Sequence, residues 1–264
     1  MRTLKAATKI KKHEFIAYRS NVYLNFLFGC VPLFFSILLW KAIYGSNTDV
    51  IGGYSYKQII TYYVIAFLLS QIINVRETTV EMSEMIQSGN IHNYMLKPIG
   101  FFSLNFKLFL AEKLVFFLNI FIPYSVFCLL IHQYIFVNVK SIPFFVLSIW
   151  LAFILKYIIG CILGLLTTWV EEISGLLDFW DNIENFFSGG LLPLSIFPVP
   201  LYRVVSFLPF KYFLFVPIDI YMGEMQIREV VVTLTIQIAW IVILGLLLHI
   251  IKLKAYKKYS GYGT

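Results

Sequence analysis

One stretch of the sequence, residues 171–217, restricts the fold more than any other, because a half-polar helix and a proline-rich segment lie among long apolar runs. At about 100° per residue, a helix over residues 173–192 carries polar side chains on one half and apolar side chains on the other. A carboxylate that faces hydrocarbon costs roughly 3 kcal/mol or more at mid-depth. The polar half should therefore line a protein interior, a water-filled path or a subunit seam. Its members include Asp178, Asp181, Asn182, Glu184 and Asn185.

The segment that follows this helix stays apolar but contains five prolines between residues 193 and 217. Each proline removes a backbone donor and interrupts a continuous helix. Broken backbone at membrane depth survives only where protein or water covers it. We therefore expect a re-entrant pair of short helices over residues 193–217 in place of an ordinary loop. The motif residues that mark it are Gly189, Gly190, Pro193, Pro198 and Pro209.

The remaining apolar runs predict an all-α membrane protein, a single domain over residues 1–264. The chain is 59% apolar and 13% charged, with a mean hydropathy of +0.80, which is typical of a polytopic membrane protein. A bilayer needs roughly 20 apolar residues per helical span. Six spans are expected, over residues 23–44, 56–75, 108–131, 143–170, 173–192 and 230–251. Residues 1–19 are basic and lack the cleavage pattern of a signal peptide.

The distribution of basic residues predicts the orientation. Fourteen Lys and Arg residues lie in the N-terminal, 76–113 and C-terminal segments, whereas five lie in the alternate connections. The positive-inside rule then places both termini in the cytoplasm. Residues 1–19 are expected to form an amphipathic helix on the inner leaflet, or else a frayed topogenic tail. A rival topology lays residues 172–190 flat on the inner interface and lets residues 201–220 cross instead.

Several motifs of enzymes and nucleotide-binding proteins are missing. None of the glycines is followed by Lys, so the chain has no P-loop for ATP. His13-Glu14 is not followed by a zinc-protease histidine, and no GxSxG nucleophile elbow occurs. The three cysteines lie far apart and predict neither a disulfide framework nor a zinc site. We therefore expect no enzyme activity, no metal site and no cofactor of the chain's own. We also expect no nucleic-acid partner, because the basic residues behind the net charge of +7 follow the membrane topology.

A helix is expected over residues 76–87, in the cytoplasmic connection 76–105. Glu77, Glu81 and Glu84 follow one another at i, i+4 and i+7 and therefore share one face. Ser88-Gly89 ends the helix, since glycine provides a C-terminal cap. The acidic face is a candidate docking surface for a basic partner, and a solvated loop helix is the alternative.

Lys156 and the acids of the predicted fifth span form a second constellation. If the chain turns near Glu171, helical rise brings Glu184 within about one turn of the depth of Lys156. A Lys–carboxylate pair inside the bundle would hold both charges away from lipid. Alternatively, Lys156 snorkels or faces a wet vestibule.

Two motifs are similar to those of the permease subunits of the type-two ATP-binding-cassette (ABC) exporter family, in its bacterial six-span branch without a fused ATPase. Residues 86–98 are similar to the pattern I-x-x-G-x-[IL]-x-x-x-L-L-x-P, with His92 where relatives often carry an acid. Residues 188–198, together with 208–212, resemble the segment between the last two spans. The likeness covers nearly the whole chain in span order.

The resemblance implies a permease in a bacterial cell membrane that exports a hydrophobic or amphipathic compound such as a drug, peptide or lipid-like molecule. ATP and magnesium would bind to a separate ATPase, present in two copies. A second permease chain, identical or paralogous, would complete the path, and the re-entrant segment would lie on the outer side. The coupling helix that docks on the ATPase would include Glu77, Glu81, Glu84, Met85 and Gly89. Two other functions stay open: a secondary carrier or channel with Lys156 and the acids as ion relay, and a membrane immunity or scaffold protein.

Overall fold

The computed structural model describes residues 2–45, 50–88, 100–170, 173–223 and 225–260. These residues form an all-helical fold, with one isolated bridge between Ile51 and Tyr54. The α-helices are α1 (Arg2–Tyr44), α2 (Tyr56–Ile72), α3 (Arg76–Gln87), α5 (Phe101–Leu130), α6 (Ile142–Leu166), α7 (Ser174–Phe187), α8 (Val199–Ser206), α9 (Phe215–Met222) and α10 (Ile227–Ser260). Three short 3₁₀ turns are η1 (His132–Tyr134), η2 (Leu194–Ile196) and η3 (Pro209–Tyr212).

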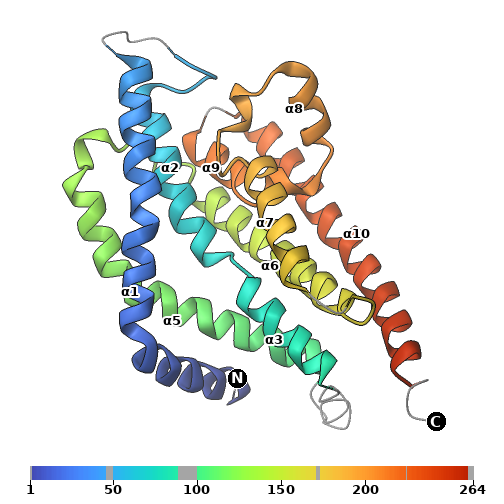
Figure 1. The fold of residues 1–264 in the computed structure, drawn as a ribbon. Coiled ribbons are helices and arrows are strands. Elements are labelled where there is room, and N and C mark those ends of the chain that lie inside the picture. Colours follow the sequence, from blue (N-terminus) through green and yellow to red (C-terminus); the bar gives the residue numbers. More distant parts are fainter. Residues whose placement is uncertain (1, 46–49, 89–99, 171–172, 224, 261–264) are drawn as a thin grey trace.

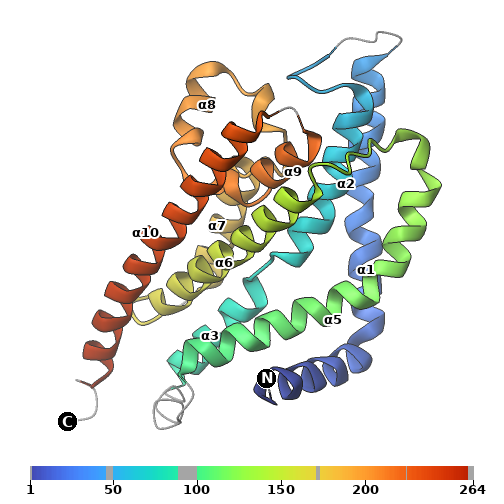
Figure 2. The same ribbon diagram turned by 180° about the vertical axis from the view of Figure 1, so that it is seen from behind.

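The helices define two ends of the molecule. The N-terminal part of α1, α3 and the C-terminal end of α10 lie at one end, which we call the α3 end (Figure 1). The turn before α2 and the short helix α8 lie at the opposite end, which we call the α8 end (Figures 1 and 2). Both chain termini are therefore on the same side of the fold.

Within the described residues, five helical segments are long and apolar enough to cross a membrane: α1, the α2–α3 pair, α5, α6 and α10. The predicted span over residues 173–192 is not among them, because α7 has 14 residues. At a rise of about 1.5 Å per residue, α7 is roughly 21 Å long, which is short of the ~30 Å hydrocarbon core. The helix ends before Gly189, whose φ of +89° is left-handed.

The rival crossing over residues 201–220 does not form a continuous helix either. This stretch is divided among α8, η3 and α9. Prolines lie at the start of these elements: Pro193 precedes η2, Pro198 precedes α8, and Pro209 is the first residue of η3. The first N–H groups of a helix have no partner within it, so a proline there loses no hydrogen bond. The segment predicted to be re-entrant therefore consists of short helical elements.

α1 is two helices joined at a bend. Tyr18 has non-helical angles (φ −109°, ψ 16°), and the preceding residues run across the direction of the long C-terminal part (Figure 1). The bend lies at the end of the segment predicted to rest on the inner leaflet, residues 1–19. One chain segment thus contains a short lateral helix followed by a span.

The core lies around α2, α6 and α9. Tyr62, Leu155 and Phe213 are fully buried there, whereas most of the apolar surface of α1, α5 and α10 is exposed. α10 runs beside α6, and α1 lies against α5 (Figure 2). The peripheral helices thus present apolar surface to the surroundings, as expected of helices that contact lipid or a partner subunit.

α3 packs directly on α6 because two glycines face it. A Cβ on Gly160 would lie 2.4 Å from a methyl carbon of Val75, and one on Gly164 would lie 3.3 Å from Cβ of Met82. Gly160 and Gly164 form a G-x-x-x-G pair, the spacing that lets membrane helices approach closely. The approach buries Thr79 and Met82 of α3.

Candidate functional site

The site begins at the break between α2 and α3. The chain leaves the helix at Ile73, and the Asn74 side chain accepts a hydrogen bond of 2.8 Å from the backbone N–H of Arg76. This contact satisfies one of the unpaired N–H groups with which a new helix starts. Arg76 is thereby held at the first turn of α3. A cation there is opposed by the helix dipole, so nearby acids are needed to stabilise it.

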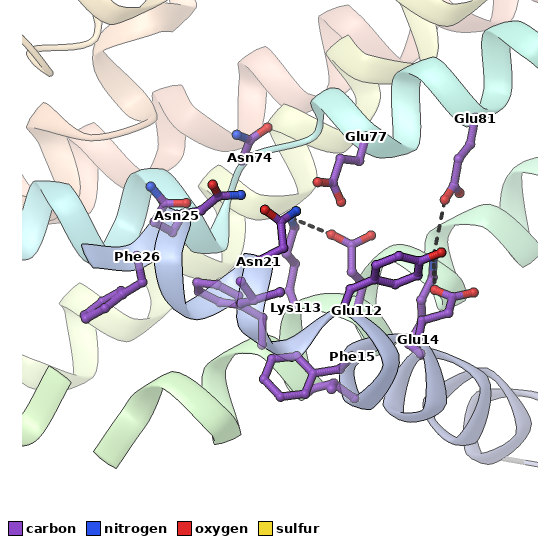
Figure 3. A pocket seen from close by; sticks show the side chains of 16 residues that line it. Glu14, Phe15, Asn21, Asn25, Phe26, Asn74, Glu77, Glu81, Glu112 and Lys113 are labelled. Carbon is purple, nitrogen blue, oxygen red and sulfur yellow. Dashed lines mark hydrogen bonds and ion pairs between the residues drawn. The ribbon is translucent and has the colours of Figure 1, made fainter. Parts of the chain in front are cut away.

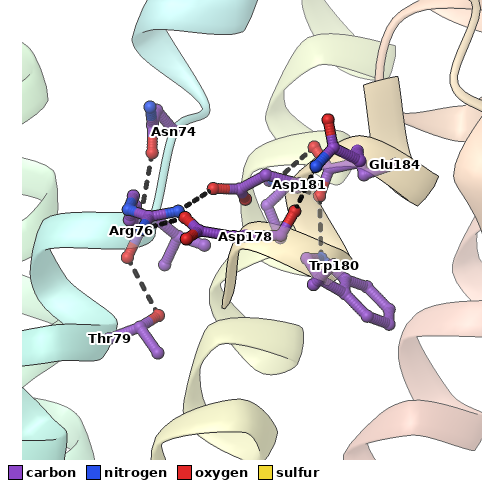
Figure 4. A network of polar contacts seen from close by, with 10 residues as sticks. Asn74, Arg76, Thr79, Asp178, Trp180, Asp181 and Glu184 are labelled. Carbon is purple, nitrogen blue, oxygen red and sulfur yellow. Dashed lines mark hydrogen bonds and ion pairs between the residues drawn. The ribbon is translucent and has the colours of Figure 1, made fainter. Parts of the chain in front are cut away.

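Two aspartates of α7 supply that compensation (Figure 4). The Arg76 guanidinium donates to Asp178 at 2.7 Å and, through its other terminal nitrogen, to Asp181. Asp178 and Asp181 are three residues apart and so share a face of α7. The Asp178 side chain is 66% exposed and that of Asp181 is 45% exposed. Exposed pairs of this kind contribute about 0.2–1 kcal/mol each, so this connection can be broken at low cost.

A second ion pair lies deeper, between α6 and α7. Both carboxylate oxygens of Glu184 accept from the Lys156 ammonium, and the two side chains are 15% and 6% exposed. The Trp180 indole N–H donates to Glu184 at 3.0 Å, and the Phe213 ring centroid lies 5.4 Å from the Lys156 nitrogen. Both charges are thus surrounded by partners, as a buried ion pair requires. The structure thus brings together Lys156 and Glu184, the two residues for which the sequence predicts a similar depth.

The other polar residues of α7 stabilise its own backbone. The Asn182 side chain donates to the carbonyl of Asp178 at 2.7 Å. The carbonyl of Asn185 accepts from the N–H groups of Gly190 and Leu191 at 3.1 and 3.2 Å, and this closes the C-terminal end of the helix. Asn182 and Asn185 are both exposed.

Hydrogen bonds from α2 hold the segment after α7. The Tyr62 hydroxyl donates to the carbonyl of Gly189 at 2.8 Å, and the Tyr63 hydroxyl donates to that of Leu191 at 3.0 Å. The N–H of Phe215 donates to the carbonyl of Ser188 at 3.0 Å. The irregular backbone near Gly189 and Gly190 is thus satisfied inside the protein.

The three glutamates of α3 point to different surroundings. Glu84 is exposed, whereas Glu81 accepts from Lys11 of α1 at 3.3 Å. Glu77 and Glu81 both line a cavity of about 340 Å³ between α3, the bend of α1 and α5 (Figure 3). Met85 is half-buried, and Gly89 and His92 lie outside the described residues. Two of the three acids thus face a cavity within the chain.

Charged residues that the sequence reasoning did not single out also line this cavity. Lys11 pairs with Glu14 at 2.9 Å, and Lys113 pairs with Glu112 at 2.7 Å (Figure 3). Arg76 was missed as well, although a basic residue beside an acidic helix is a recognisable signal. Another signal was G-x-x-x-G in α6, which marks the surface on which α3 lies.

The described residues contain no group of three or more His, Cys, Asp or Glu side chains that could hold a metal ion. The arrangement offers ion pairs and close packing between helices. It connects α3 to α7 through Arg76, α3 to α6 through Gly160 and Gly164, and α6 to α7 through Lys156.

The long apolar helices of the fold define an integral membrane protein, in which Arg76 and Lys156 form ion pairs between helices. Residues 30–263 match the family model described as ABC-2 family transporter protein. The match extends from within α1 almost to the C-terminus, and the chain therefore belongs to this family. A search of the curated proteins finds no match. Membership makes the chain a permease component of an ABC transporter, a part that carries transport and not catalysis.

Proposed function

We propose that this chain is the permease subunit of an ATP-driven exporter in a bacterial cell membrane. It works with two copies of a separate ATPase, which bind ATP and magnesium, and with a second permease chain, identical or paralogous. The observation that carries the proposal is the attachment of α3 to both α6 and α7. A movement imposed on α3 by an ATPase would reach the helices next to the transport path.

We further propose six membrane crossings, with the α3 end in the cytoplasm. The two ends of the described chain lie at the same end of the fold, which supports an even number of crossings (Figure 1). The described residues contain five long helices, an odd number, and we propose that the chain between α6 and α10 makes the sixth crossing. In this proposal α7 and the short elements that follow it cross together, with the re-entrant part on the outer side. The excess of Lys and Arg at the α3 end supports this orientation.

The docking surface for the ATPase is proposed to be the exposed face of α3 near its C-terminal end. Glu84 is exposed there and Met85 lies beside it. Glu77 is exposed too, but together with Glu81 it lines the cavity next to α1. The residues after α3, including Gly89, would complete the surface. The cycle then runs as follows: nucleotide binding closes the ATPase pair, α3 moves, and α6 and α7 move with it.

The substrate is proposed to be a hydrophobic or amphipathic compound. The path would follow the polar half of α7, where Asp178 and Asp181 are the exposed acids. Their charge favours a cationic group on the substrate. A carrier that uses Lys156 as an ion relay is less well supported, because Lys156 is 4% exposed and engaged by Glu184.

The test is to purify the chain together with the ATPase encoded beside it and to reconstitute the complex in lipid vesicles. We expect the ATPase to copurify and candidate substrates to stimulate ATP hydrolysis. Glu84→Lys should weaken copurification at least tenfold. The matched control Glu229→Lys reverses an exposed charge at the start of α10, away from α3, and should leave copurification unchanged. Transport that proceeds without ATP, or an ATPase that binds the Glu84→Lys variant normally, would refute the proposal.

A further inference from the structure

A second cavity, of about 450 Å³, lies at the α8 end, apart from the network around α3. Its walls come from three segments that are distant in sequence: the turn before α2, the region from η2 to α8, and α9. A volume of this size is within the range of small-molecule sites, roughly 300–1,000 Å³.

The lining has an unusual chemical composition. Nine described residues form it, and the one charged side chain among them is Asp219. The aromatic members are Tyr54, Phe197, Tyr202 and Phe215. None of the nine is Lys, Arg or His. The site therefore excludes anions by its charge and offers a single carboxylate among aromatic rings.

The carboxylate of Asp219 is held in a fixed position. The Tyr54 hydroxyl donates to it at 2.8 Å, and Tyr54 is 2% exposed. Burial, together with the charge of Asp219, raises the pKa of the Tyr54 hydroxyl above its ordinary value, so this donor stays protonated. Tyr202 lines the same cavity as Asp219.

Two glycines line this cavity. Gly52 and Gly53 both have positive φ, +59° and +86°. A Cβ on Gly52 would lie 2.5 Å from a side-chain carbon of Ile196, whereas one on Gly53 would meet no described atom within 4 Å. The turn thus packs tightly on η2 at one residue and leaves open space at the next.

We propose that this cavity binds an organic ammonium ion, with Asp219 as its counter-ion and the aromatic side chains as the wall around its alkyl groups. Aromatic faces attract ammonium ions through their quadrupole, and this attraction is strongest where water is excluded. A metal ion fits poorly, because calcium takes six to eight oxygen ligands and the cavity supplies one carboxylate. The inference concerns binding by this chain alone and does not depend on the proposed ATPase.

The experiment measures binding of choline to the purified full-length chain by isothermal titration calorimetry. The matched ligand is 3,3-dimethylbutan-1-ol, which replaces the charged nitrogen of choline by carbon at nearly the same shape. We expect choline to bind at least tenfold more tightly than the neutral alcohol. Equal affinities, or no choline binding by folded protein, would overturn the proposal.

Variants locate the site. Asp219→Asn keeps an acceptor for Tyr54 but removes the charge, and it should weaken choline binding at least tenfold. Glu229→Gln removes a carboxylate that is not part of the cavity and should leave the affinity unchanged. If Asp219→Asn fails to fold, Tyr202 is substituted instead. Tyr202 is 37% exposed, so a substitution there should leave the protein folded. Tyr202→Leu should weaken binding about threefold or more and Tyr202→Phe should not. Unchanged binding in both Asp219→Asn and Tyr202→Leu would refute the assignment.

The ammonium group could belong to a soluble amine or to a lipid headgroup. The chain is therefore placed in bilayers of phosphatidylglycerol alone or mixed with phosphatidylethanolamine, and the choline titration is repeated. Weaker apparent choline binding in the mixed bilayer identifies the lipid amine as a competitor. Equal binding in both bilayers assigns the site to soluble ammonium compounds.

Discussion

The ion pair between Lys156 and Glu184 leads to the sharpest prediction about stability. The perturbation is a set of three variants: Lys156→Met, Glu184→Gln and the two combined. Lys156→Met leaves the carboxylate of Glu184 with the indole N–H of Trp180 as its remaining donor. Glu184→Gln leaves the ammonium of Lys156 beside the Phe213 ring in an apolar interior. Each single variant thus leaves one buried charge without its counter-ion.

The expected magnitude follows from the burial of the pair, whose side chains are 6% and 15% exposed. Removing one partner of a buried ion pair costs about 3–5 kcal/mol, whereas removing both charges is often close to neutral. For a chain of this size, each kcal/mol shifts the melting temperature by roughly 2–4 °C. Each single variant should therefore lower the melting temperature by about 6–20 °C, and the double variant should be clearly more stable than either.

The assay is thermal unfolding of the purified protein in detergent, followed by intrinsic fluorescence. Lys140→Met is the matched control, since Lys140 is exposed near the start of α6 and the same substitution there should change the melting temperature little. The coupling energy is obtained from the cycle of two singles and one double. If the double variant loses as much stability as the two singles added together, the two charges do not interact and the reasoning is wrong.

Three further predictions follow from the structure. Arg76→Gln should lower the melting temperature by only a few degrees, because its pairs are exposed, yet it should reduce the ATP-driven transport rate several-fold in reconstituted vesicles. Gly160→Val should destabilise the protein by about 2 kcal/mol or more in thermal unfolding, because its side chain would overlap Val75; Gly175→Val, where a Cβ meets no described atom within 4 Å, should cost far less. Tyr54→Phe should cost about 1 kcal/mol of stability, since it removes one hydrogen bond to Asp219; an unchanged melting temperature would contradict that role.

Hydropathy and helix geometry predict much of this fold from sequence. The five long helices correspond to five of the six expected spans, because a run of about 20 apolar residues has few alternatives to a helix. Counting residues from a turn predicts similar depths for Lys156 and Glu184, since rise per residue is nearly constant in a helix. Both inferences use properties that a single segment carries by itself.

Other features depend on contacts between distant segments and could not be predicted in the same way. Helix periodicity predicts one half-polar span over residues 173–192, but the left-handed φ of Gly189 and the hydrogen bond from Tyr62 accompany an earlier end of the helix. The pairing of Arg76 with α7 depends on the break between α2 and α3, which periodicity does not reveal. The cavity around Asp219 combines three segments, and no local pattern joins them.

The charges along α7 explain how a short helix is held in one rotation about its axis. Asp178, Asp181 and Glu184 follow at three-residue steps, each about 60° around the helix, so Arg76 of α3 and Lys156 of α6 hold different parts of one arc. Leu177 lies within the same arc and is the one buried residue of α7, all of which the structure describes. Phe179 lies on the opposite side and is 64% exposed.

The edge of the polar half that carries Leu177 and Glu184 packs against the protein, whereas Asp178 is exposed. The two ionic attachments of α7 differ in strength. The contact with α6 through Glu184 is buried and costly to break, whereas the contact with α3 through Asp178 and Asp181 is exposed. In the proposed transport cycle, α6 and α7 would then move as one body while the ion pairs of Arg76 with Asp178 and Asp181 break. Cross-linking cysteines placed at residues 76 and 178 should therefore block transport, whereas the same cross-link between residues 156 and 184 should preserve it. Equal inhibition by both cross-links would mean that the two contacts do not divide the motion in this way.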